Sequence, residues 1–110
     1  MFRIGSVCCA LSLAAVASVA SANEDKHKET CRVTADIVRL SVTHRAQGED
    51  VDAVKDIFMT GNTAVAEKYQ PTVGPIVDWV FSLETAVIEG SGAANAVAKT
   101  YHESCLGYKP

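Results

Sequence analysis

The spacing of apolar residues along the chain becomes helical at about residue 30. Cys31, Ala35, Val38 and Val42 recur at intervals of four, three and four residues, which places them on one face of an α-helix. Most charged residues of this stretch fall off that face, and Gly48 follows as a C-terminal stop signal. The pattern predicts a first amphipathic helix that begins near residue 30 and ends before Gly48.

Three shorter segments show the same kind of spacing. A second helix is expected after the acidic residues 49–50, with one apolar face made of Val51, Val54, Ile57 and Phe58. A third is expected over residues 64–69, ended or kinked by Pro71. The last is expected over residues 93–105, after a flexible connection at 89–92, and its apolar face holds Ala94, Val97, Ala98, Tyr101 and Cys105. No alternating strand pattern recurs, so the prediction is an all-α fold, a small bundle of four or five helices.

The most apolar segment beyond residue 22 is PTVGPIVDWVFSL, residues 71–83. Its polar positions repeat every four residues, which favours a buried central helix over the alternative, a buried strand. We take it as a candidate core or interaction helix, represented by Ile76, Asp78, Trp79 and Phe81. Asp78 is interpreted as part of a solvent-facing stripe with Gly74 and Ser82, rather than as a catalytic carboxylate. A lone tryptophan between valines is more typical of a core than of an exposed binding anchor.

Residues 1–22, MFRIGSVCCALSLAAVASVASA, have the three parts of a secretory signal peptide. One positive charge at Arg3 precedes an apolar run that closes on small residues, with cleavage expected near Ala22 or two residues earlier. The alternative is an N-terminal membrane anchor. We therefore expect a periplasmic or secreted protein without a stable membrane span after cleavage. The exported protein would then consist of a charged N-terminal tail, or a frayed first helical turn, at 23–29, NEDKHKE, and a single helical domain at 30–110.

Only Cys31 and Cys105 remain after loss of the signal peptide, which contains the other two of the 4 cysteines. In an oxidising compartment such a pair predicts a disulfide; two unpaired buried thiols are the alternative. The bond would join the start of the first helix to the end of the last. If these helices pack along their length, they must then run antiparallel.

The remaining chemistry points away from catalysis. The formal charge of −3 becomes one unit more negative without Arg3, which gives no basis for binding nucleic acid or an anionic membrane surface. In the antiparallel arrangement His44 and His102 would lie roughly 15 Å apart along the helix axis, too far to share a metal ion. The chain also lacks CxxC, GxSxG, HExxH and glycine-rich phosphate motifs. We expect no enzymatic activity, no metal and no cofactor.

Three segments carry a resemblance to small uncharacterised helical proteins of the bacterial periplasm: ETCRVTADIVRLSVTHRAQG, PIVDWVFSL and AVAKTYHESC. This resemblance implies that Cys31 and Cys105 form a structural pair, and it implies no activity. The segment EKYQPTVG is similar to a Gln-Pro-Thr stretch in acid-stress chaperones of the HdeA type, which are short helical periplasmic proteins with one disulfide.

Two functions follow as hypotheses. The first is a non-catalytic exported module that binds another protein of the cell envelope through a helix face. The second is a periplasmic chaperone activated by acid, in which protonation of carboxylates opens the core and exposes residues 71–83 while the disulfide tethers the ends.

Overall fold

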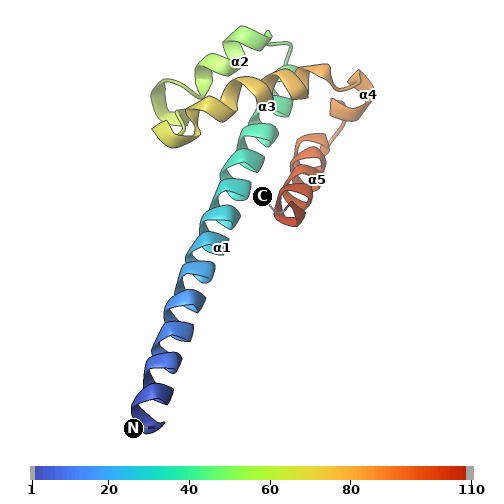
Figure 1. Cartoon of the computed structure of the whole chain (residues 1–110). Coiled ribbons are helices and arrows are strands. Elements are labelled where there is room, and N and C mark those ends of the chain that lie inside the picture. The colour runs from blue at the N-terminus through green and yellow to red at the C-terminus, as the bar shows by residue number, and fades with distance from the viewer. Residues whose placement is uncertain (1, 109–110) are drawn as a thin grey trace. The chain divides into compact units, whose positions relative to one another are not determined.

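The computed structural model describes the backbone of residues 2–108 and the side chains of residues 21–108. This part of the chain is helical and contains no strand, so the all-α prediction is confirmed (Figure 1). Its elements are α1 (Phe2–Ala46), α2 (Val51–Ile57), the 3₁₀ turns η1 (Gly61–Thr63) and η2 (Glu67–Tyr69), α3 (Gln70–Ser82), α4 (Thr85–Ile88) and α5 (Ala93–Gly107).

The chain divides into two compact units, residues 1–30 and 31–110. In the first unit the predicted signal peptide lies almost wholly outside the residues whose side chains are described, so its assignment stays a prediction. Residues 23–29 belong to α1, and their side chains are exposed except for the half-buried His27. The segment expected as a charged tail is thus helical in the structure.

In the second unit the predicted apolar face of the first helix is confirmed. Cys31, Ala35, Val38 and Val42 are all buried, with Ile37 widening the stripe. The helix ends as expected at residues 47–49. Gly48 adopts a left-handed φ of +90°, the Gly48 N–H donates to the Arg45 carbonyl and the Glu49 N–H donates to the His44 carbonyl, which is the Schellman pattern of a helix terminus.

The prediction of an α-helix over residues 64–69 is wrong. This segment contains only the single 3₁₀ turn η2, and the 3₁₀ turn η1 precedes it. Ala64 and Ala66 have extended backbone conformations, and Pro71 lacks the N–H that a helix continuing from this segment would need. Two hydrogen bonds tie this connection back to the end of α2: the Val65 N–H donates to the Phe58 carbonyl at 2.9 Å, and the Thr63 hydroxyl of η1 donates to the Ile57 carbonyl at 2.5 Å.

The central segment is the helix α3, so the strand alternative is excluded. Pro71 lies in its first turn, where the missing N–H costs nothing, and Pro75 lies further inside. The buried face of α3 packs with α1, α2, α4 and α5 in one core, to which it contributes Val73, Ile76, Val77 and Val80.

The last helix, α5, begins after the glycines at positions 90 and 92, both with positive φ, and its Ala98 is buried. The short helix α4 before it was not predicted. Cys31 and Cys105 form the predicted disulfide, with their Cα atoms 5.6 Å apart. Residues 31–46 of α1 therefore run antiparallel to α5, as expected (Figure 1).

Candidate functional site

The four residues proposed for the central helix have four different environments. Ile76 is part of the core. The carboxylate of Asp78 is exposed, as expected, and accepts the Lys55 ammonium of α2 at 2.8 Å. Phe81 is half-buried, and the Arg45 guanidinium lies 5.8 Å from its ring centroid. Only Trp79 combines a large apolar side chain with exposure.

The expectation that Trp79 belongs to the core is wrong, because its side chain is 41% exposed. The inward positions of α3 on either side of it are taken by Val77 and Val80, both fully buried. Since successive helical residues are about 100° apart, Trp79 then falls at the edge of the buried face. Its indole rests on Tyr101 of α5, with ring centroids 6.0 Å apart and planes at 45°, a tilted geometry typical of favourable aromatic pairs.

Trp79 lines an apolar groove of about 360 Å³ between α3, α4 and α5. We call it the Trp79 groove; its other lining residues are Leu83, Val87, Ala96, Val97 and Thr100. Val87 of α4 is 47% exposed, so the rim of the groove presents two large apolar side chains to solvent. Sequence reasoning missed Val87 because residues 85–88 were not expected to be helical.

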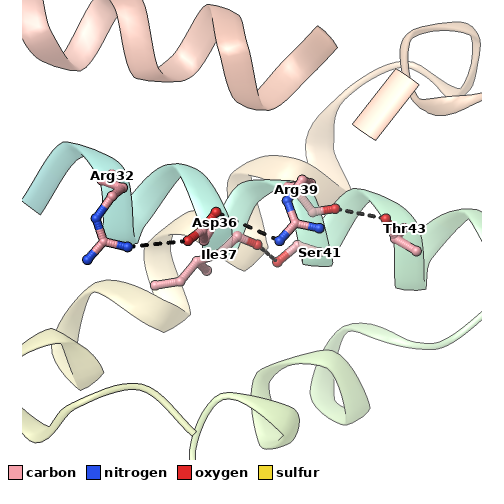
Figure 2. A network of polar contacts seen from close by, with 6 residues as sticks. All are labelled: Arg32, Asp36, Ile37, Arg39, Ser41 and Thr43. Carbon is pink, nitrogen blue, oxygen red and sulfur yellow. Dashed lines mark hydrogen bonds and ion pairs between the residues drawn. The ribbon is translucent and has the colours of Figure 1, made fainter. Parts of the chain in front are cut away.

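A second groove lies between α1 and α5; polar and charged side chains surround it while apolar atoms form much of its floor, and we call it the polar groove. Its two hollows have volumes of about 400 and 320 Å³. The second hollow is lined by Arg32, Asp36, Arg39, Lys99 and His102, among others. Asp36 forms ion pairs with both arginines, at 3.8 Å to Arg32 and 3.7 Å to Arg39 (Figure 2).

The histidines are in separate environments. His44 bonds through Nδ1 to the Glu49 carboxylate just beyond the end of α1, whereas His102 lines the polar groove on α5. Among the described side chains no three His, Cys, Asp or Glu residues are grouped so that they could hold a metal ion. Nor does any helix, within the residues described, have the length and apolar character needed to cross a membrane.

Comparisons with protein-family models, with curated proteins and with solved structures found no match for this chain. The two resemblances noted from the sequence therefore stay predictions, and any functional inference rests on the residues described above.

Proposed function

We propose that this protein is a non-catalytic exported binding module, and that the Trp79 groove holds an apolar helical segment of another envelope protein. The observation that carries the proposal is the exposure of the chain's single tryptophan on the rim of an apolar groove. Tryptophan is strongly enriched among the residues that dominate binding energy at protein interfaces.

The apolar lining of the Trp79 groove favours an apolar helix as its ligand over a small polar molecule. Its lining is formed almost wholly by apolar side chains from three helices, with Thr100 as the one hydroxyl. A partner helix could insert side chains at i, i+3 and i+4 spacing between Trp79 and Val87, which is the usual mode of helix-in-groove recognition. The Trp79 indole already packs against the Tyr101 ring, so the Trp79 side chain loses little conformational freedom when a partner binds.

Acidic residues flank the groove and define the charge of the partner. Glu84 directly follows Leu83, and Glu103 lies one helical turn beyond Thr100 on α5; both are exposed. Asp78, next to Trp79, is already paired with Lys55. We therefore expect the bound segment to carry Lys or Arg beside its apolar face.

The test is selection from a displayed library of short random peptides, followed by titration of the selected peptides. Because Trp79 is the only tryptophan in the chain, its emission reports directly on the groove and should shift to shorter wavelength when a peptide covers it. Selected sequences should combine an apolar helical face with basic flanks. The substitution Val87→Ser should weaken their binding at least tenfold, since it places a hydroxyl in the buried contact.

Met59→Ala is the matched control, because Met59 is also 41% exposed but does not line the groove. It should leave peptide affinity unchanged. Peptides that bind the Val87→Ser variant as tightly as the parent protein, or a library that yields no enriched sequence, would contradict the proposal.

The acid-activated chaperone is the weaker alternative. Its premise is that protonated carboxylates release the core, yet the carboxylates of the Asp78–Lys55 and Asp36 ion pairs are more than half exposed. Exposed pairs of this kind contribute about 0–1 kcal/mol each, so their loss would open the domain only slightly. Circular dichroism and dye binding between about pH 7 and about pH 2 separate the two functions, because only the chaperone requires loss of packing in acid.

A further inference from the structure

The polar groove between α1 and α5 is a feature that the proposed function does not use. Its two hollows share Arg39 and Asn95, so they lie next to each other along the antiparallel pair of helices. Ala35 of α1 and Ala98 of α5 line it, and each is only 8% exposed. Small side chains at these two positions leave room between the longer polar residues on the rims.

The rims carry an excess of positive charge. Arg32, Arg39 and Lys99 are basic, and Asp36 is the one carboxylate among the lining residues of the two hollows. The chain as a whole has a formal charge of −3, so the net charge around the polar groove is opposite in sign to that of the whole molecule. A concave surface with charges of one sign concentrates the field acting on an incoming counter-ion.

Asp36 only partly neutralises the two arginines. Its oxygens are 3.8 and 3.7 Å from their guanidinium nitrogens, near the outer limit of an ion pair, and the three side chains are 42–65% exposed. Figure 2 shows the carboxylate between Arg32 and Arg39 on one side of α1. The forked donors of a guanidinium can bind a carboxylate or phosphate through two parallel hydrogen bonds, and these long contacts leave that capacity largely unused.

Lys99 and His102 of α5 line the polar groove on the side opposite α1. Both line the same hollow as Arg32 and Arg39, and Lys99 forms no ion pair within residues 21–108. An anion placed between the helices would thus meet two guanidinium groups on one side and an ammonium on the other. A single negative charge could not satisfy all three.

We propose that this groove is a binding site for a small molecule that carries a doubly charged oxyanion, a phosphate group or a pair of carboxylates. Arg39, which lines both hollows, is the central ligand residue, and Arg32 and Lys99 bind from either side. Asp36 lowers the affinity by repelling the anion, and at the same time keeps the empty site compatible with its neighbouring arginines.

The test is nuclear magnetic resonance titration of the disulfide-bonded protein at constant ionic strength. Inorganic phosphate, glycerol 3-phosphate and succinate are the probes that distinguish free phosphate, a phosphate ester and a dicarboxylate; acetate is the monovalent control. Saturable shifts are expected at residues 32–39 and 95–102 with at least one divalent probe and not with acetate. Arg39→Gln should weaken that binding roughly tenfold or more.

Two exposed variants make the test independent of any effect on folding. Lys99→Gln should weaken binding, whereas Lys68→Gln, with the same change in net charge outside the groove, should not. Asp36→Asn should strengthen binding several-fold, since it removes the repelling charge. The proposal is overturned if no divalent probe gives saturable shifts, if Lys68→Gln and Lys99→Gln act equally, or if Asp36→Asn weakens binding.

Discussion

Arg45, in the last turn of α1, donates a hydrogen bond from Nη1 to the main-chain carbonyl of Val80 in α3 at 2.8 Å. The same nitrogen donates to the Leu83 carbonyl, also at 2.8 Å, and the guanidinium lies over Phe81. Helix α3 ends at Ser82, where the last carbonyls lack i→i+4 partners; the Leu83 N–H also donates to the Val80 carbonyl, at 3.3 Å. One side chain of α1 therefore caps the C-terminus of the central helix.

Replacement of Arg45 by Met should lower the free energy of unfolding by about 1–3 kcal/mol, because part-buried carbonyls lose a charged donor while the apolar stem is retained. Urea unfolding followed by circular dichroism measures the change. Arg32→Met is the control: the Arg32 side chain is 65% exposed and, among the described residues 21–108, forms its ion pair with Asp36, so its loss should cost less than about 0.5 kcal/mol. Equal losses in the two variants would show that Arg45 has no capping role.

Removal of the disulfide should be the most destabilising covalent change. The bond closes a loop with a sequence separation of 74, and the loss of loop-closure entropy predicts about 4 kcal/mol. We expect the Cys31→Ala, Cys105→Ala double variant, and the parent protein in reductant, to unfold at similarly reduced urea concentrations. Alkylation of both cysteines in untreated protein, seen by intact mass, would refute the bond itself.

Substitution of two valines, Val80 of α3 and Val87 of α4, distinguishes a core position from a groove position. Val80 is 0% exposed and Val87 is 47% exposed. Val80→Ala should cost about 2 kcal/mol, because it removes two buried carbon atoms and leaves a cavity. Val87→Ala should cost less than about 0.5 kcal/mol, as is usual for exposed positions. Thermal unfolding of the pair checks the assignment; comparable losses would mean that Val87 is covered by the fold.

The end of α1 depends on the backbone conformation of Gly48. A side chain at this position meets no atom within 4 Å, but φ is +90°, a region that alanine adopts only at a cost of about 1 kcal/mol. Gly48→Ala should therefore lower the melting temperature. Gly107→Ala, also in open space but at a helical position, should leave it unchanged or raise it slightly. If Gly107→Ala were destabilising and Gly48→Ala neutral, the positive φ of Gly48 would not be what the end of α1 requires.

Much of the fold could be predicted because its signals are local or covalent. The periodicity of Cys31, Ala35 and Val38 defined the buried face of α1, and the four-residue repeat of polar positions identified α3 as a helix. The two cysteines that remain beyond residue 22 then predicted the antiparallel arrangement of α1 and α5. Each of these inferences needs only the neighbours of a residue along the chain, or a single bond.

The candidate sites depend on contacts that the sequence does not encode locally. Arg45 is three residues after Val42 and continues the buried stripe of α1, but nothing near it along the chain indicates a partner 35 positions away. The nearby valines favour a core position for Trp79 in the sequence. On the helix, however, Val77 and Val80 occupy the buried face, and Trp79 lies at its edge. The cationic groove joins Arg39 to Lys99 across two helices, so it exists only once α5 packs against α1.

The disulfide also determines what a protease could release from this protein. The segments around Gly61 and Gly90 lie between the two cysteines, as do all residues that line both grooves. A single cut anywhere between Cys31 and Cys105 would therefore leave both fragments in one covalent molecule, heavier by one water. Proteolytic nicking would separate them only after reduction, and gel mobility in the absence of thiols would conceal the damage.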